Sequence, residues 1–181
     1  MSNKLKIVLG AATIIFVAIA SYFWPSSPER ILLRTSFLEK KGESGGQWLR
    51  DNLIGCGPAA IRPTILAIRE HSPWNRNYAD LPQVLEHFGE PAHLALLEAV
   101  DKEIDSEKRA YLIDTLLFSF GDISRFDLWL NDEKGKSNSW ALNHVAGSFR
   151  FRFPEAPALE KDRQLNPDFL SWWETNSLAK Q

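Results

Sequence analysis

The sequence contains only one cysteine, Cys56, among its 181 residues. A single thiol excludes a fold held together by internal disulfide bonds and leaves the redox compartment undetermined. Cys56 falls at an apolar position of the repeat described below. We therefore expect a buried thiol rather than a nucleophile.

Positive charge is also scarce. Lys4 and Lys6 are the only charged residues of the first 24, and the remainder has 19 basic against 23 acidic side chains. Nucleic-acid binding needs Lys and Arg clustered against phosphates, so this balance argues against a nucleic-acid partner. An apolar fraction of 44% allows one core of small-domain size, in which seven tryptophans and eleven phenylalanines would pack between layers.

Motifs for nucleotide or calcium binding are incomplete. Gly135-Lys136-Ser137 looks like the end of a phosphate-binding loop, but Leu130 stands where that loop requires its first glycine. The alternating carboxylates Asp101, Glu103, Asp105 and Glu107 resemble calcium ligands. A calcium loop, however, needs glycine at position 106 and glutamate at position 112, which are Ser106 and Leu112. We expect this stretch to be a solvated turn between two helices.

Catalytic constellations are missing as well. The four histidines, at positions 71, 87, 93 and 144, include no pair four residues apart, so no zinc-protease helix is present. No serine lies in the strand-turn-helix setting of a nucleophile elbow. The sequence therefore assigns no catalytic, cofactor-binding or metal-ligating residue. It predicts no cofactor and favours a protein that is not an enzyme.

One long apolar run is present near the N-terminus. Ile7 to Trp24 contains no charged residue and, as a helix of 18 residues, would be about 27 Å long, close to the thickness of a bilayer core. Tyr22, Phe23 and Trp24 suit a membrane interface. We expect residues 1–24 to form a single-pass transmembrane or signal anchor that contacts the membrane through residues 7–24.

The alternative for this segment is a signal peptide cleaved after Ala20, because Lys4 and Lys6 precede the apolar run and Ala18-Ile19-Ala20 is a small-residue site. Orientation rests on those two lysines. A short basic stub before an apolar segment usually stays in the cytoplasm. We expect the body to be periplasmic or otherwise extracytoplasmic, although four basic residues soon follow the segment.

A repeat of 32 residues covers much of the remaining chain. Leu53 to Gly57, Leu85 to Gly89 and Leu117 to Gly121 share the pattern of leucine, two residues, an apolar residue and glycine. Other apolar columns keep this spacing, namely Ala60 with Ala92, Ile65 with Leu97 and Trp129, Leu81 with Ile113 and Val145, Val84 with Leu116, and Leu85 with Leu117 and Phe149. Such self-similarity is typical of stacked helix pairs.

Each unit is expected to be two helices closed by a glycine in a left-handed conformation. We place the units at 25–56, 57–88, 89–120 and 121–152. The expected helices are near 28–40, 46–54, 58–70, 79–88, 91–101, 106–119, 123–131 and 138–147. In the middle unit, Leu94, Leu97 and Val100 mark the apolar face of the first helix. Ser106 or Asp105 would cap the second helix, and a kink is expected near Ala60 to Pro63.

The sequence Phe88-Gly89-Glu90-Pro91-Ala92, with Lys108-Arg109-Ala110 opening the next helix, resembles HEAT-like repeats of the short class over residues 45–150. The resemblance implies an all-α fold, an α-α superhelix of about four helix pairs over residues 25–152. It also suggests that Arg109 is a structural arginine bridging neighbouring turns. Residues 153–181 would form a C-terminal capping segment, with a last short helix starting at Asn166 and Pro167 whose tryptophans fold back.

These features favour a membrane-tethered scaffold or adaptor whose second helices line a shallow concave face for a protein partner in the cell envelope. Two alternatives stay open. Some short HEAT-like proteins are similar to lyases that handle tetrapyrroles, although no residue here selects that chemistry. A secreted or membrane-bound repeat protein with a purely structural role is the other.

Overall fold

The computed structural model describes residues 27–40, 46–71, 78–133, 139–162 and 164–176. These residues form a mostly helical, all-α chain with one two-residue hairpin, β1 (Glu160–Lys161) paired antiparallel with β2 (Gln164–Leu165). The helices are α2 (Pro28–Lys40), α3 (Gly46–Gly55), the 3-10 helix η1 (Gly57–Ala60), α4 (Ile61–Glu70), α5 (Leu81–Phe88), α6 (Glu90–Lys102), α7 (Ser106–Thr115), the π-helix η2 (Leu116–Phe120), α8 (Phe126–Glu133), α9 (Ser139–Arg152) and α10 (Pro167–Asn176).

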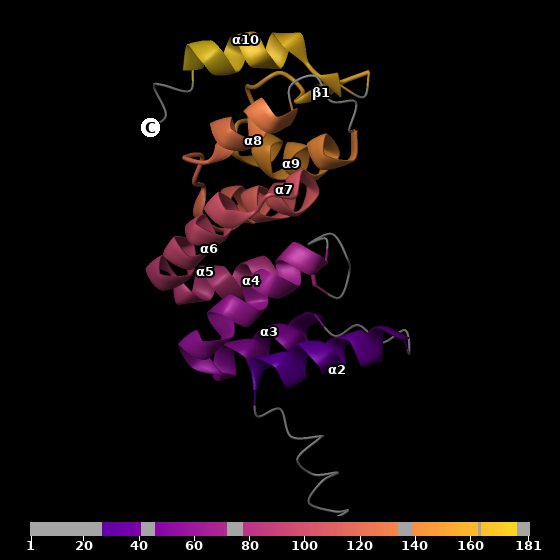
Figure 1. Cartoon of the computed structure of the whole chain (residues 1–181), viewed down its shortest axis with the longest axis vertical. Helices are drawn as coiled ribbons and strands as arrows, with labels where there is room; N and C mark the ends of the chain where they lie inside the picture. The colour runs from indigo at the N-terminus through magenta and orange to yellow at the C-terminus, as the bar shows by residue number, and fades with distance from the viewer. Residues whose placement is uncertain (1–26, 41–45, 72–77, 134–138, 163, 177–181) are drawn as a thin grey trace, which may run out of the picture.

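The helices stack along the long axis of the molecule, from α2 and α3 at one end to α10 at the other (Figure 1). Helices α2, α4 and α6 contact one another in sequence and form a first layer. Helices α3, α5, η2 and α9 do the same in a second layer, and α7 packs most extensively against α9. The helices expected from the sequence agree with these elements to within a few residues at each boundary.

Glycines separate the pairs as the repeat predicts. Gly57, Gly89 and Gly121 are the glycines with positive φ in the described part of the chain, at 67°, 63° and 65°. The predicted left-handed α conformation is confirmed at Gly121, with ψ of 18°. It is wrong at Gly89, whose ψ of −136° lies in a different positive-φ region that is open almost only to glycine. A new helix starts at Gly57 and another directly after Gly89.

Proline positions explain two helix starts. Pro58 lies in the first turn of η1 and Pro91 in the first turn of α6, where no backbone donor is needed. Pro63 lies in the first turn of α4 because the expected helix 58–70 is divided into η1 and α4. The kink predicted near Ala60 to Pro63 falls where the 3-10 helix η1 is followed by the α-helix α4.

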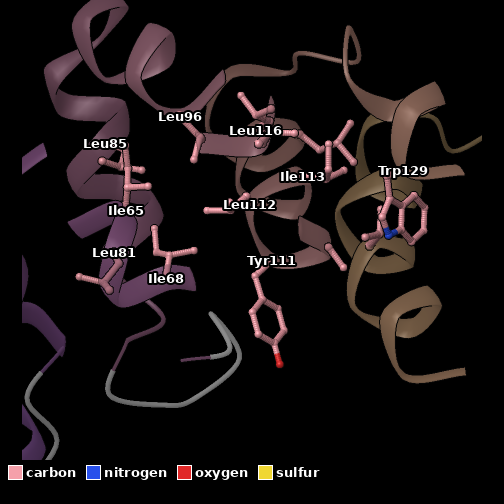
Figure 2. Packing of buried hydrophobic residues seen from close by; sticks show 14 of the residues in the cluster. Ile65, Ile68, Leu81, Leu85, Leu96, Tyr111, Leu112, Ile113, Leu116 and Trp129 are labelled. Atoms are coloured by element: carbon pink, nitrogen blue, oxygen red, sulfur yellow. The ribbon is translucent and has the colours of Figure 1, made fainter. Parts of the chain in front are cut away.

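The apolar repeat columns form one continuous core. Ile65, Leu81, Leu85, Leu96, Leu112 and Leu116 meet where the second and third units face each other, with Trp129 on the far side of α7 (Figure 2). The column residues are buried except Leu97 and the three that precede the glycines, Cys56, Phe88 and Phe120, which are partly buried. The predicted face of α6 is wrong at Leu94, which is 58% exposed, because the helix turns Ala92, Leu96 and Val100 inward instead.

The C-terminal helix α10 packs on the last pair. Trp173 is buried, and its ring lies 4.7 Å from the Phe126 ring and 5.8 Å from the Phe149 ring, centroid to centroid. Its indole N–H donates to an Asp127 carboxylate oxygen at 2.5 Å. Asn166 stands before the helix as the sequence suggested, and its side chain accepts a hydrogen bond from the Asp168 N–H.

No helix in these described ranges is both long and apolar enough to cross a membrane. The anchor expected at Ile7 to Trp24 lies outside them, as does Gly135-Lys136-Ser137.

Candidate functional site

Two neighbouring grooves lie on the outer side of the first-layer helices. The groove between α2 and α4 has a volume of about 600 Å³, and the groove between α4 and α6 has about 490 Å³. Both volumes are in the range of ligand and peptide sites. Arg62 and Leu66 of α4 line both grooves and form the ridge between them.

The α2/α4 groove is predominantly apolar. Leu33 and Leu66 stand on its two walls with 63% and 53% of their surface exposed, and Pro63 and Ala67 are among the other lining residues. Helix α4 commits Ile61, Ile65 and Ile68 to the core, so the 3.6-residue period carries Leu66 to the opposite side. Leucines exposed to this extent on adjoining walls are typical of a surface that another molecule covers.

His71 and Tyr78 form an aromatic pair in the lining of this groove. The His71 and Tyr78 rings, which both line it, are stacked with centroids 4.6 Å apart and planes 3° from parallel. Tyr78 is only 2% exposed, so the exposed His71 ring is the member of the pair that a docked molecule can contact. Flat rings supply contact area at low conformational cost, which suits recognition of an apolar side chain.

The α4/α6 groove is lined by charged side chains that are already paired. Arg69 of α4 forms an ion pair with Glu103, and Lys102 donates to Glu98 at 2.5 Å along α6. Burial alone would raise the pKa of the Glu103 carboxyl, but the Asp105 N–H and the Arg69 guanidinium together hold it below its ordinary value. The Arg69–Glu103 pair connects two consecutive units, the Lys102–Glu98 pair lies within α6, and together they leave few charges available to a ligand.

Arg62 is different from the other cations around the grooves. None of the ion pairs formed among the described residues includes Arg62. Lys102, already paired with Glu98, is the main cause of the lowered pKa of that carboxylate, to which the Arg62 charge only adds. A guanidinium on the ridge between two grooves is therefore available to a carboxylate on a docked molecule.

The carboxylates that resembled calcium ligands all serve the protein itself. Asp101 forms an ion pair with Arg125 at 2.6 Å, and Glu103 forms one with Arg69. Asp105 caps α7 by accepting hydrogen bonds from the Glu107 and Lys108 N–H groups. The Glu107 carboxylate accepts a hydrogen bond from the Tyr111 hydroxyl. The expected inter-helix turn is confirmed, and so is the Asp105 cap. The turn is not simply solvated, because Glu103 is buried and Asp101 is ion-paired.

Arg109 bridges neighbouring turns, as the repeat suggested. Its guanidinium donates to the Glu103 carbonyl oxygen in the preceding turn and forms an ion pair with Asp132 at the end of α8. The side chain is 12% exposed. Arg109 therefore links the third and fourth units rather than facing a ligand.

The histidines lie apart in the described structure. His93 contacts Asp122 at 2.5 Å and stacks on Phe120, His144 packs edge-on against Tyr111, and His87 packs edge-on against Phe88. Burial lowers the pKa of His144. Across the described ranges, no group of three or more potential ligands is placed to hold a metal ion.

A buried carboxyl group between α7 and α9 was not predicted from the sequence. Asp114 is 4% exposed and accepts a hydrogen bond from the Ser148 hydroxyl, while its Oδ1 has no hydrogen-bond partner among the residues that the structure describes. Burial raises its pKa to about 7. Ser148 and His144 lie nearby in sequence, yet Asp114 binds the serine directly, which is not the order of a Ser–His–Asp relay. Position 114 gave no signal because an acidic residue in a helix is normally exposed.

Cys56 is only partly buried, against the core, and burial followed by the nearby Glu29 raises the pKa of its thiol. A raised pKa disfavours the thiolate, which is the reactive form. Cys56 is therefore a poor nucleophile, as expected, but the expectation of a buried thiol is wrong, because the residue is only partly buried.

The grooves lie on the first helices, whereas the sequence placed the partner surface on the second helices. Helix α7 is buried from Ala110 to Thr115, which leaves its central turns no free face for a partner. The exposed leucines Leu33, Leu66, Leu94 and Leu128 all belong to first helices, whereas the exposed Phe118 and Phe151 belong to second helices. The position of the grooves could not be predicted from the sequence, because both helices of each unit have apolar columns.

Comparisons of the chain with protein-family models, with curated proteins and with solved structures find no match.

Proposed function

We propose that the chain is a membrane-tethered helical-repeat scaffold that binds a protein partner in the cell envelope. The observation that carries the proposal is the pair of adjoining grooves on α2, α4 and α6, with exposed leucines on their walls and, between them, Arg62, which forms no ion pair with another described residue. Open, elongated grooves suit a polypeptide better than a small substrate, which is usually enclosed.

A HEAT-like superhelix is the finer fold that we propose. Three features support it: positive φ at three glycines 32 residues apart, burial of the repeated apolar columns, and two layers of successive helices. In stacked repeats each unit contacts mainly its neighbours, and the stack exposes long surfaces. Extended surfaces of this kind are suited to protein partners.

The tether is proposed from the sequence. Ile7 to Trp24 has the length and composition of a membrane-spanning helix, and the basic residues Lys4 and Lys6 favour a cytoplasmic N-terminus. The body would then lie outside the cytoplasm and reach partners at the membrane surface.

Fractionation of cells tests the tether. The full chain should stay with membranes after carbonate washing and be digested by protease added outside the inner membrane. A chain lacking residues 2–24 should be soluble. Recovery of the full chain in the soluble fraction, with a mass that starts after Ala20, would replace the tether with a cleaved signal peptide.

A pair of matched variants tests the scaffold. Leu66→Glu places a charge in both grooves, and Leu128→Glu makes the same change at a 42% exposed leucine of α8 that lines neither groove. Proteins that co-purify with the chain from detergent-solubilised envelopes should be lost with Leu66→Glu and kept with Leu128→Glu. Equal loss in both variants would count against the grooves.

The enzyme alternative predicts a different outcome. A tetrapyrrole or other small ligand that raises the melting temperature by several degrees, without any co-purifying protein, would favour it over the scaffold.

A further inference from the structure

The α2/α4 groove is tied to the start of the described chain. Glu29, Leu32 and Leu33 of α2 form one wall of it. Four residues lie between Trp24 and Glu29, so the Cα atoms of these two positions are five steps of the chain apart and can be no more than about 18 Å from each other, whatever conformation the intervening residues adopt. If Trp24 lies at the membrane interface, the groove must lie close to the bilayer surface.

We propose that this groove binds the juxtamembrane segment of a second membrane protein, as an amphipathic helix with an apolar stripe and one carboxylate opposite Arg62. This inference deepens the proposed function and rests on it, because the short tether is what restricts the groove to partners at the membrane surface.

The apolar residues that line the α2/α4 groove determine which positions of the partner helix must be apolar. Leu32, Leu33, Leu66 and Ala67 extend along the two walls, and the His71–Tyr78 stack forms part of the same lining. A helix lying in such a groove inserts residues spaced i, i+3, i+4 and i+7. Leucine, isoleucine or phenylalanine at those positions would cover Leu33 and Leu66, which are otherwise more than half exposed.

The charge of Arg62 is the reason for placing a carboxylate on the partner helix. Glu70 is bound by Lys108, at 2.8 Å, and Glu29 lies in the first turn of α2, where the helix dipole stabilises an anion. Arg62 has neither kind of compensation, and it stands on the ridge above the groove. A guanidinium beside an apolar groove selects an acidic residue next to the apolar stripe, since it binds a carboxylate with two parallel hydrogen bonds.

Site-specific photo-crosslinking of the full chain in its native cells tests this proposal. Benzoylphenylalanine is placed at position 33 or 66 in the groove and, as controls, at the exposed positions 94 and 128 on other first helices. Adducts are identified by mass spectrometry of the crosslinked peptide. Positions 33 and 66 should give an adduct with a membrane protein, within about 20 residues of a transmembrane segment and beside Asp or Glu. Positions 94 and 128 should not give this adduct.

Charge substitution completes the test. Arg62→Glu should reduce the adduct about tenfold, and Arg62→Lys should keep most of it. Because Arg62 is exposed, both variants should melt at the temperature of the parent chain, which is measured alongside. An adduct unaffected by Arg62→Glu would overturn the assignment of the carboxylate.

The remaining outcomes separate the two proposals. A lipid, a soluble protein or a second copy of this chain at positions 33 and 66, or no adduct there, would overturn the juxtamembrane proposal while leaving the tether in place. Recovery of the chain in the soluble fraction would overturn the tether, and the present inference with it.

Discussion

At the residue scale, the carboxyl group of Asp114 is removed from water, since only 4% of the residue is exposed. It lies on α7, which packs against α9, and accepts a hydrogen bond from the Ser148 hydroxyl of α9. Burial disfavours the ionised form, which is why its pKa rises to about 7. In the unfolded chain the same group ionises near pH 4. The folded state therefore holds more protons than the unfolded state between these two values.

Stability should consequently fall as pH rises from about 4 to about 7, because the unfolded state gains the charge first. Asp114→Asn removes this titrating group, so the loss of unfolding free energy with rising pH should be smaller than in the parent chain by about 2–4 kcal/mol. Urea unfolding at pH 5 and at pH 8 measures it. Asp51→Asn, at an exposed position of α3, is the matched control and should change nothing. Parallel pH profiles for parent and Asp114→Asn would contradict the burial argument.

Leu94 and Leu96 show what a pattern of apolar residues can and cannot predict. The 32-residue columns located the core because each repeated position meets the same neighbours in every unit. Helical spacing within one unit was less informative, since α6 has apolar residues on more than one face and a shift of one or two positions rotates the stripe. The buried Asp114 gave no sequence signal, because burial depends on the facing helix.

These two leucines provide a second prediction. Leu96→Ala should cost about 2–5 kcal/mol of unfolding free energy, because Leu96 is fully buried between the second and third units. Leu94→Ala should change stability by less than about 0.5 kcal/mol, because its side chain is 58% exposed. Denaturant unfolding of both variants is sufficient. Equal losses would mean that α6 is rotated from the orientation described.

At the scale of elements, helices are tied to the next unit by charged side chains as well as by the core. Arg109 joins the turn before α7 to the end of α8, and Arg152 at the end of α9 donates to the Leu117 and Phe118 carbonyl oxygens of η2. These carbonyls lie in η2, before the helix ends at Gly121. The Leu117 carbonyl oxygen also accepts from the Gly121 N–H, so Arg152 adds a second donor there. The helix boundaries were predictable from capping residues and glycines. The partners of these arginines were not, because they come from distant parts of the sequence.

A double-mutant cycle tests the link between the third and fourth units. Arg109→Met and Asp132→Asn should each destabilise the chain, and the double variant should lose less than the sum, with a coupling of about 1 kcal/mol. The Arg109 side chain is mostly buried, so salt should screen this coupling only weakly. Arg50 and Asp51, an exposed neighbouring pair, form the control cycle, whose coupling should be near zero. Strict additivity for Arg109 and Asp132 would show that they do not interact.

At the scale of the whole molecule, helix pairs are separated by glycines 32 residues apart, and the stack presents its grooves on the first helices. The order of helices and the joints followed from the sequence, because each depends on local spacing. The position of the grooves did not, because it depends on how far neighbouring first helices separate above the shared core. The tether and the partner remain proposals, which fractionation and crosslinking test.

The most direct test concerns the joints. Replacing Gly89 by L-alanine or by D-alanine, through protein ligation, changes only the handedness of one carbon. The methyl group of L-alanine at position 89 would have no atom within 4 Å other than those of the neighbouring residues. Any loss of stability would therefore come from the backbone conformation and not from a steric clash. L-Alanine should destabilise the chain by about 1–3 kcal/mol, because φ of 63° is strained for it, while D-alanine should be neutral or stabilising. Equal unfolding free energies for the two variants would contradict the claim that Gly89 is a positive-φ joint between helix pairs.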